Sequence, residues 1–401
     1  MRLVILDSGL KGRAGHNYAY DVAVGTEARR RGLEVVALAH HWFPEGDPAP
    51  FEVRPTFSHS CYDRVSKDPI SGSHDNFSHL NPVFRRELDA LPRSLFGPGD
   101  MVWVPTTTEN QLKALLDWAA AFAPDEAPAV AVTLVLQAGA TAAPTHLQIT
   151  NPFRALFYRL MLRKALPPWV HLMATGRQLA RDYSYLAQRE IPIHPLILPN
   201  AGPLAPPADP RCILLYAGES SPQKGVTLLP DMVRRLAALT PEWRLLIHAN
   251  DATRWQTLGP VRALKAMQAE TPSLDLRTGF LEPEAYNQLL TEAAVVAMPY
   301  NQDAYRSQTS GVLWEAVHAG RPIVVPRGTY LEREAKALGA SYAAVDTRDG
   351  AEAAEEIAAA LSGGDLSSET AMAAGRRFRE GNGLQAFMDE LLSLAPAAPV
   401  S

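Results

Sequence analysis

The chain has 401 residues, of which 47% are hydrophobic and 20% charged, a composition typical of globular proteins and not of disordered or fibrous ones. Its length predicts two domains, because single hydrophobic cores rarely grow beyond about 250–300 residues. The formal net charge of -5 argues against nucleic-acid binding, which usually depends on an overall positive field.

The start of the chain and its cysteines indicate a cytoplasmic protein. The opening apolar run has only the length of a strand and reaches Asp7, whereas a secretory signal needs a longer apolar core. The longest apolar stretch, residues 127–143, is interrupted by polar residues and is shorter than the roughly 20 residues of a spanning helix. We interpret it as a buried strand and its loop. Cys61 and Cys212 lack the spacing of a zinc site or disulfide framework, which fits a reducing compartment.

Short apolar runs alternate with helix-like segments along the first half of the chain, which predicts a parallel sheet covered by helices. Strands are expected at residues 3–6, 34–39, 101–104, 130–136, 171–174 and 194–198. The first helix is predicted over residues 18–31, because Gly32 is a typical C-terminal stop. We interpret residues 56–82, with their irregularly spaced histidines, as a polar, mobile loop rather than as a metal site.

The second half repeats the same alternation. Strands are expected at residues 212–217, 244–248, 274–278, 295–298, 322–325 and 341–344, and helices near 225–238, 283–292, 310–319 and 330–338. Residues 199–211 contain five prolines and suit an exposed connection, so the domain boundary is placed there. A helix-rich tail, about residues 351–394, closes the chain.

The loop from Gly218 to Gly225 follows a predicted strand and precedes a predicted helix. Ligands of doubly wound sheets bind beyond the carboxyl ends of the strands, and Lys224 at a helix N-terminus would make an anion site. The loop is not a P-loop, because its spacing differs and no Ser or Thr follows Lys224. The alternative is an ordinary turn with a solvated lysine.

A second loop leads into the helix predicted at 310–319. Ser310 is expected to cap this helix, and Gly311 and Val312 offer free backbone N–H groups to a phosphate. Glu315, within two turns of the same end, suits a pair of ribose hydroxyls; alternatively it is only a favourable charge early in a helix. Together, the two loops predict that a diphosphate is held from two sides.

Two further loops are candidates for the site. Gly279 and Phe280 follow a strand and could present an aromatic face to a base, or Phe280 could simply be buried at a turn. In the first half, Gly15 and His16 end a glycine-rich loop whose spacing is not that of a dinucleotide-binding fingerprint. We interpret His16 as a contact to phosphate or acceptor; the alternative is a capping or packing role.

These landmarks, taken in order, resemble those of the GT-B glycosyltransferases, and in particular the retaining group called glycosyltransferase family 4. The resemblance covers nearly the whole chain, includes Ile-Leu-Pro-Asn at 197–200, and is strongest from about 196 to 330. It implies an α/β fold of two tandem Rossmann-like domains with a cleft between them. The acceptor-side domain would span 1–199, the nucleotide-sugar-binding domain 200–375, and a C-terminal helix at 376–401 would pack back towards the first domain.

The resemblance also implies a function: transfer of a hexose, with retention, from a nucleotide diphosphate sugar to an acceptor hydroxyl in glycan or glycolipid synthesis. No metal and no cofactor would be needed. Lys224 would contact the diphosphate, Glu315 the ribose, and the amides of Ser310, Gly311 and Val312 a phosphate. The rest of the donor site is expected at Gly15, Gly218, Gly225 and Phe280.

The chain departs from the family pattern at three positions. Ser307 replaces the family's first glutamate, and Glu219 replaces a basic residue, so Arg306 is expected to supply the missing charge. Gln137 stands where a histidine is common, which leaves His16 as the candidate catalytic imidazole.

Two other functions remain open. One is a GT-B-fold epimerase, which would need a pair of carboxylates in the cleft; Asp7, Asp21 and Glu109 are the candidates, but they form no convincing pair in the sequence. The other is a protein that binds nucleotide sugars without catalysis.

Residues 151–166 carry four basic side chains and no acid, with apolar side chains at helical spacing. Such a helix can lie in a membrane interface, and the resemblance implies that lipid-linked acceptors are common among relatives. We therefore expect a peripheral contact with the inner face of a membrane. The alternative is a surface helix whose apolar face packs on the first domain.

Overall fold

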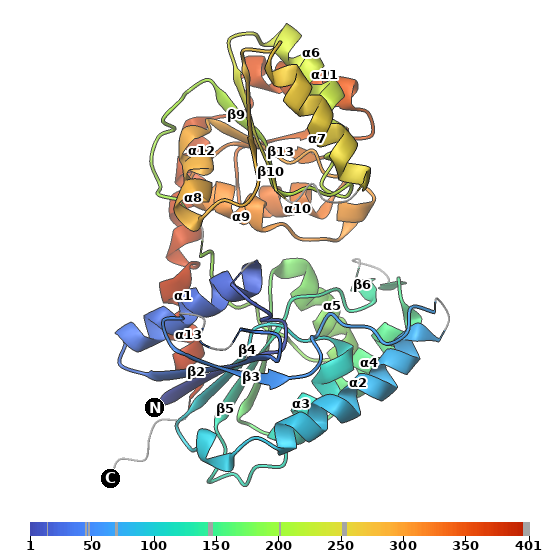
Figure 1. Ribbon diagram of the computed structural model, residues 1–401, viewed down its shortest axis with the longest axis vertical. Coiled ribbons are helices and arrows are strands. Elements are labelled where there is room, and N and C mark those ends of the chain that lie inside the picture. The colour runs from blue at the N-terminus through green and yellow to red at the C-terminus, as the bar shows by residue number, and fades with distance from the viewer. Residues whose placement is uncertain are drawn as a thin grey trace. The chain divides into compact units, whose positions relative to one another are not determined.

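The computed structural model describes residues 1–13, 15–44, 46, 49–68, 71–142, 147–199, 202–250 and 255–395. Ala14 of the glycine-rich loop and Asn200 of the predicted linker therefore lie outside the described residues. The chain forms two compact units, Met1–Pro199 with Asn382–Ser401, and Asn200–Gly381. Each unit has a parallel sheet covered by helices (Figure 1), so the predicted fold class of two Rossmann-like α/β domains is confirmed.

The sheet of the first unit has the strand order β3-β2-β1-β4-β5-β8, and every neighbouring pair is parallel. Its strands are β1 (Arg2–Asp7), β2 (Glu34–His40), β3 (Glu52–Phe57), β4 (Met101–Val104), β5 (Ala129–Leu134) and β8 (Val170–Ala174). A small antiparallel pair, β6 (Ala140–Ala142) and β7 (Leu147–Ile149), lies outside this sheet. The strand order reverses between β1 and β4: the strands that follow β1 are added on one side of it, and β4 and the later strands on the other. Folds of this type bind ligands at such a point.

Helices cover both faces of this sheet, because its central strands are apolar on both sides. Leu3 and Ile5 of β1 pack with α1 (His16–Arg30) and α13 (Leu384–Ser393), while Val4 and Leu6 face the opposite layer. That opposite layer consists of α2 (Gly72–Asp89), α3 (Glu109–Ala119), α4 (Pro152–Leu162) and α5 (Arg177–Ala187), with the short η1 (Arg93–Leu95) nearby in sequence. The C-terminal helix α13 is thus an integral part of the first unit, where Phe387 lies against Trp103 of β4.

The second unit repeats the topology with the strand order β11-β10-β9-β12-β13-β14. Its strands are β9 (Cys212–Glu219), β10 (Arg244–Asn250), β11 (Leu274–Thr278), β12 (Val295–Ala297), β13 (Ile323–Pro326) and β14 (Tyr342–Val345). Its helices are α6 (Leu229–Leu239), α7 (Trp255–Gln268), α8 (Pro283–Glu292), η2 (Ala304–Arg306), α9 (Gly311–His318), α10 (Tyr330–Ala337), α11 (Gly350–Gly363) and α12 (Ser368–Glu380). Helices α6, α7 and α11 cover one face, and the direction reverses between β9 and β12.

The predicted elements of the first half need three corrections. Residues 194–198 form no strand; only an isolated bridge joins Ile193 to Ala174. The edge strand β3 was not predicted, because Pro55 interrupts an already polar sequence, and proline is tolerated only at a sheet edge. The predicted polar loop at 56–82 is wrong beyond residue 71, where α2 begins and runs through Pro82.

The second unit needs two corrections. The helix expected from residue 225 begins only at Leu229, after a series of turns. The helix α7 was not expected, and it contains Pro260. The structure also divides the units at Gly381 rather than at residue 375, because α12 continues to Glu380 and packs on α9.

Candidate donor site

Lys224 lies at the carboxyl end of β9 in the second unit, where the sheet topology favours ligand binding. Its ammonium lies beside Gly218, since a Cβ on that glycine would be 3.4 Å from Nζ. Gly218 has a φ of 107°, which other residues rarely adopt, so a glycine both turns the chain and leaves room for the lysine. Burial lowers the pKa of Lys224, although Glu219 and Glu315 oppose this shift. Within the described ranges, no carboxylate forms an ion pair with this ammonium.

The backbone around Lys224 does not form the predicted amide anion site. The N–H of Lys224 donates to the carbonyl of Ser221, and the N–H of Gly225 donates to that of Pro222. Because the helix begins only at Leu229, these amides are used within the turn. The lysine side chain, and not a helix terminus, is therefore what this loop can offer to a phosphate.

Glu315 lies in the second turn of α9, and its carboxylate is held in place. The hydroxyl of Tyr286, from α8, donates to Oε2 of Glu315 at 3.0 Å. Burial raises the pKa of Glu315 to about 7, while Tyr286 and the charge of Lys224 act in the opposite direction. Lys224 and Glu315 thus influence each other's ionisation, and the structure brings together the two residues predicted for the diphosphate and the ribose.

The start of α9 keeps the predicted backbone donors but not the predicted cap. Ser310 occupies the N-cap position, but its hydroxyl accepts no cap hydrogen bond and instead donates to the hydroxyl of Tyr300 at 3.5 Å. The expected capping role of Ser310 is therefore wrong. Gly311 and Val312 begin the helix, where backbone N–H groups have no intrahelical acceptor, and Gly311 is exposed. These backbone N–H groups could donate hydrogen bonds to a bound anion.

Buried polar atoms at the ends of β9 and β10 lie beside Lys224 and Tyr286, and the sequence analysis did not predict them. Ser220 Oγ, His248 Nδ1 and Asn250 Oδ1 have no hydrogen-bond partner within the described residues. His248 Nε2 is 2.9 Å from the carbonyl oxygen of Gly279, and its ring meets Tyr286 edge to face. Buried polar groups are normally paired, so these atoms indicate partners supplied by a ligand or by water. Their position at the carboxyl ends of predicted strands was the one feature of the sequence that could have indicated them.

Two other predicted residues of the second unit lie on its surface. Phe280 follows β11 and is largely exposed, which contradicts the alternative of a buried phenylalanine and leaves an aromatic face open. The guanidinium of Arg306 is 2.9 Å from Asp303, in a pair that is exposed to solvent on both sides. The structure therefore does not place Arg306 beside Lys224, and its predicted role in charge compensation stays a prediction.

The predicted residues of the first unit lie at the start of α1. Gly15 is the N-cap residue and has a φ of 92°, with open space where a Cβ would stand. His16 Nε2 is 3.2 Å from the hydroxyl of Tyr62, and the ring is exposed at its outer side. The surrounding protein still removes part of its hydration, which lowers the pKa of this imidazole.

The carboxyl pair that the sequence did not reveal is present, but it is buried. Asp7 ends β1, and Asp21 lies in α1; both are almost fully inaccessible. Asp7 accepts from the N–H of Gly9 at 2.7 Å and from Nδ2 of Asn17 at 2.8 Å. The oxygens of Asp21 have no donor within the described chain, and burial, together with Asp7, raises its pKa well above the usual value.

We infer that Asp21 is protonated in the folded protein, because an unpartnered buried carboxylate is strongly unfavourable. Burial also raises the pKa of Asp7 to about 6. At these two carboxyl groups the folded state therefore holds more protons than the unfolded state above about pH 4, so their contribution lowers the stability as the pH rises to 6 and beyond. Asp21→Asn should remove this loss and raise the stability at pH 8 by on the order of 1–3 kcal/mol.

Denaturant unfolding at pH 5 and pH 8 measures this effect. The matched control is Glu27→Gln on the same helix, because hydrogen bonds from Arg30 lower the pKa of Glu27 to about 2. That variant should lose stability at both pH values. An Asp21→Asn variant that is no more stable than wild type at pH 8 would show that Asp21 is ionised.

Burial also bears on the epimerase alternative. Asp7 and Asp21 are inaccessible to a substrate, and Glu109 is buried in an ion pair with Arg154 at 2.8 Å. Neither arrangement offers the acid and base that an epimerase needs in an open site. The three carboxyl groups considered for an epimerase are therefore part of the protein interior and not of an open active site.

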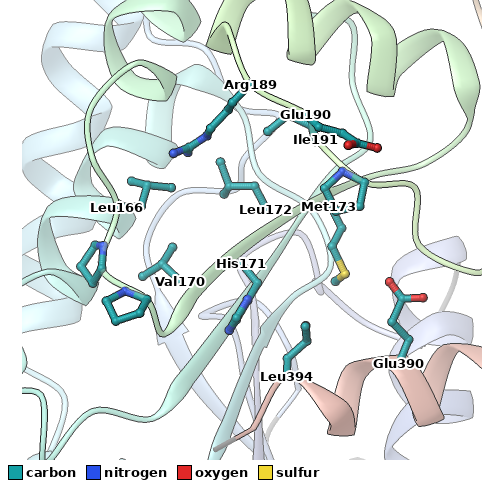
Figure 2. A pocket seen from close by; sticks show the side chains of 13 residues that line it. Leu166, Val170, His171, Leu172, Met173, Arg189, Glu190, Ile191, Glu390 and Leu394 are labelled. Carbon is teal, nitrogen blue, oxygen red and sulfur yellow. The ribbon is translucent and has the colours of Figure 1, made fainter.

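One well-formed pocket of the first unit lies apart from all these residues. It has a volume of about 360 Å³ and lies along the free edge of β8, next to α13. Figure 2 shows Leu166 and Val170 on one side of it and Glu390 on the other. None of the predicted site residues lines it, so the site is assigned from the geometry above and not from the size of a cavity.

Comparison with known proteins identifies a family for part of the chain. Residues 211–362 match the family described as Glycosyl transferases group 1. No curated protein sequence matches the chain.

Solved structures resemble both units over their full length. Sucrose-phosphate synthase from Thermosynechococcus elongatus is 15% identical with a TM-score of 0.59, and the match covers 98% of this chain and 97% of that chain. Anabaena HepE in complex with UDP is 13% identical with a TM-score of 0.58, covering 98% and 99%.

WaaG, a glycosyltransferase involved in lipopolysaccharide biosynthesis, is 13% identical with a TM-score of 0.54, covering 99% and 100%. At these identities the likeness concerns the fold, while the family match concerns the unit that holds Lys224 and Glu315. The predicted resemblance is therefore confirmed for the fold and for the second unit: residues 211–362 match the group 1 glycosyl transferases, and both units have the fold of the GT-B glycosyltransferases.

Proposed function

We propose that this glycosyltransferase moves a hexose from a nucleotide diphosphate sugar to an acceptor hydroxyl, with retention, in glycan or glycolipid synthesis. The observation that carries the proposal is the joint placement of Lys224 and Glu315 at the reversal point of the second sheet, where Lys224 has no internal ion pair among the described residues. An ammonium that is partly removed from water and has no ion pair is unfavourable unless a ligand neutralises it. A diphosphate supplies that charge.

The neighbouring groups complete the donor site in this proposal. Amides at Gly311 and Val312 lie at the positive end of α9 and would hold a phosphate, while Glu315 would accept from the ribose hydroxyls. Phe280 has an exposed ring, on which a base would stack in this proposal. HepE, which shares the fold, has been crystallised with UDP and with UDP-glucose, so uridine donors are the first to test.

The chemistry that we propose uses no cofactor, no metal ion and no protein nucleophile. As a sugar leaves, negative charge builds up on the diphosphate, and in this proposal Lys224 and the α9 amides stabilise that charge. The leaving phosphate would take the proton of the attacking hydroxyl. His16, on the first unit, is proposed as the imidazole that contacts the acceptor or phosphate.

Purified protein with radiolabelled UDP-glucose should therefore release UDP, and this release should persist in EDTA. The same assay with added magnesium or manganese is the control. Activity that disappears in EDTA and returns with either metal would contradict metal independence. Calorimetry that detects no binding of any nucleoside diphosphate or nucleotide sugar would contradict the proposed function.

We also propose that the protein is cytoplasmic and contacts the inner face of a membrane through α4. In the described part of the chain no helix is long and apolar enough to cross a bilayer. Helix α4 buries one face, which includes Phe157 and Tyr158, as the packing alternative requires. A second apolar stripe remains exposed, however, with Phe153, Leu156 and Leu160 on it, and Leu160 is 59% exposed.

Basic side chains flank this exposed stripe. Arg159, Arg163 and Lys164 are all exposed, and an apolar stripe bordered by cations is the pattern of an interfacial helix. Wild-type protein should co-sediment with anionic liposomes in low salt, and changing these three residues to glutamate should abolish it. Because Arg163 also donates to the carbonyl of Leu186, the variant Leu156→Ser with Leu160→Ser serves as a second test.

The control is a pair of charge reversals on α6, Arg234→Glu with Arg235→Glu, which also removes exposed cations but no apolar stripe. This control should sediment like wild type. If wild type and all variants sediment equally, or if none does, α4 is only a packing helix and a soluble acceptor is favoured.

A further inference from the structure

A tryptophan at the carboxyl end of β2 is exposed and yet fixed in place. Trp42 is 64% exposed, although burying an aromatic side chain would stabilise the fold. Its backbone N–H donates to Nδ1 of His40 at 3.1 Å, and the ammonium of Lys11 lies 4.8 Å from the centre of the ring. Both imidazoles of His40 and His41 also contact the indole. Folding alone does not explain an indole held open to solvent in this way.

A partly exposed ion pair lies beside this ring. Lys11 Nζ is 3.1 Å from Oδ1 of Asp63, and each side chain keeps about a third of its surface exposed. The backbone N–H of Ser60 donates to the other oxygen, Oδ2, at 2.9 Å, which fixes the carboxylate. The three loops that follow β1, β2 and β3 therefore bring an ammonium, a carboxylate and an aromatic face to one edge of the sheet.

A buried imidazole points to a missing partner at the same place. His40 is 1% exposed, and its Nε2 has no hydrogen-bond partner within the described residues. Since Nδ1 accepts from Trp42, the neutral ring carries its proton on Nε2, which is 4.0 Å from Oδ2 of Asp63. This distance is too long for a hydrogen bond. A buried donor left unpaired is unfavourable, and a hydroxyl group bound next to Asp63 would be close enough to relieve it.

We propose that Trp42, Lys11 and Asp63 form a platform that binds a neutral pyranose ring of the acceptor. A pyranose has an apolar face of C–H groups, which packs on an indole, and a rim of hydroxyls, each both a donor and an acceptor. The Asp63 carboxylate accepts from such hydroxyls, and the Lys11 ammonium donates to them. The inference rests on the proposed glycosyl transfer, because it assigns the platform to the acceptor.

The charges of the platform favour a neutral sugar over a phosphorylated one. Lys11 and Asp63 cancel each other, and burial lowers the pKa of His40 to about 4, so this imidazole adds no positive charge at pH 7. An anionic group would have to displace Asp63 from Lys11. A neutral ring can bridge the two side chains without separating them.

Fluorine NMR of the full-length protein labelled with 5-fluorotryptophan tests the platform directly. The chain has seven tryptophans, and the variant Trp42→Phe identifies the resonance of Trp42 by its disappearance. The probes are methyl α-glucopyranoside, methyl β-galactopyranoside and methyl α-mannopyranoside, with glucose 6-phosphate as the anionic comparison. At least one neutral glycoside should shift the Trp42 resonance in a saturable way, and Lys11→Met and Asp63→Asn should each weaken that binding about tenfold.

Lys113→Met is the matched control, because Lys113 forms an exposed ion pair with Asp117 at 2.5 Å on α3, away from these loops in the chain. It should bind the glycoside like wild type. UDP affinity is measured on the same samples. Wild type that binds UDP while no glycoside moves the Trp42 resonance overturns the platform and leaves the proposed function intact.

Two other results also overturn the platform. One is tighter binding of glucose 6-phosphate than of every neutral glycoside, and the other is loss of UDP affinity in Trp42→Ala, which would assign Trp42 to the donor. Wild type that binds neither UDP nor any other nucleoside diphosphate contradicts the proposed function itself.

Discussion

Replacing Lys224 with methionine is expected to weaken UDP binding by roughly tenfold to a hundredfold, equivalent to about 1.5–3 kcal/mol for a charge-assisted hydrogen bond. Methionine keeps most of the aliphatic stem and removes only the charge. Because no carboxylate of the described chain pairs with this ammonium, and burial already lowers its pKa, the variant should fold as stably as wild type or more so. Calorimetry with UDP and denaturant unfolding of the same samples separate the two effects.

Glu315→Gln should weaken UDP binding to a similar extent, because an amide accepts ribose hydroxyls less strongly than a carboxylate. The amide oxygen can still accept from Tyr286, so folding should be preserved. Since the pKa of Glu315 is about 7, the affinity of wild type for UDP-glucose should increase as the pH rises from 6 to 8, and that of Glu315→Gln should not. UDP-glucose is used because its phosphates do not titrate in this range.

Lys336→Met is the charge-matched control for Lys224→Met and also the reference for Glu315→Gln. Lys336 is exposed on α10 of the same unit, so its removal lowers the net charge by as much as Lys224→Met does and leaves the site untouched. If Lys224→Met and Glu315→Gln bind UDP as tightly as this control, the donor site has been placed on the wrong residues.

Gly225→Ala is expected to destabilise the protein by about 3 kcal/mol or more. Gly225 has a φ of 78°, where a residue with a Cβ is strained by about 1–3 kcal/mol, and this Cβ would overlap the carbonyl oxygen of Pro299. The oxygen belongs to the backbone and the position of the Cβ is fixed by the backbone, so neither can move away as the end of a flexible side chain can. The turn that carries Lys224 thus lies directly against the chain that follows β12.

Alanine variants of two other glycines in the same unit distinguish backbone strain from the steric clash of the added Cβ. Gly279 has a φ of 90° but nothing near its missing Cβ, so Gly279→Ala should show backbone strain without the clash. Gly311 has neither a positive φ nor a close neighbour, and Gly311→Ala should be nearly neutral in stability. Chemical denaturation should therefore show the largest loss of stability for Gly225→Ala, a smaller loss for Gly279→Ala and the smallest for Gly311→Ala. A Gly225→Ala variant as stable as Gly279→Ala would mean that the turn is not packed on Pro299.

The sequence was sufficient to locate most of the central strands, because strands such as β4 and β9 are nearly continuous apolar runs that are buried on both faces. It failed for β3, where an edge position permits Pro55 and polar residues, and for α2, where Pro82 lies within the helix. In these elements the tertiary environment outweighs the local propensity.

The candidate site was predictable for the same reason that the central strands were, since Lys224 and Glu315 follow elements that the sequence identifies well. The contacts between distant segments were not predictable. Tyr286 bonds to Glu315 across 29 positions, and Asp21 meets Asp7 only because α1 folds back on β1. A single sequence holds no signal for either pairing, and the buried charges become visible only with coordinates.

The placement of α13 in the first unit affects how the chain folds during synthesis. Domains usually fold in order from the N-terminus as they leave the ribosome. Here the second unit, Asn200–Gly381, is inserted between two parts of the first, so it can finish folding while the first is still incomplete. Until Phe387, Met388 and Leu391 emerge, the face of the sheet around Trp103 has no complete cover. A nascent chain stalled before residue 384 would thus carry a second unit that can fold and a first unit whose sheet still exposes an apolar face.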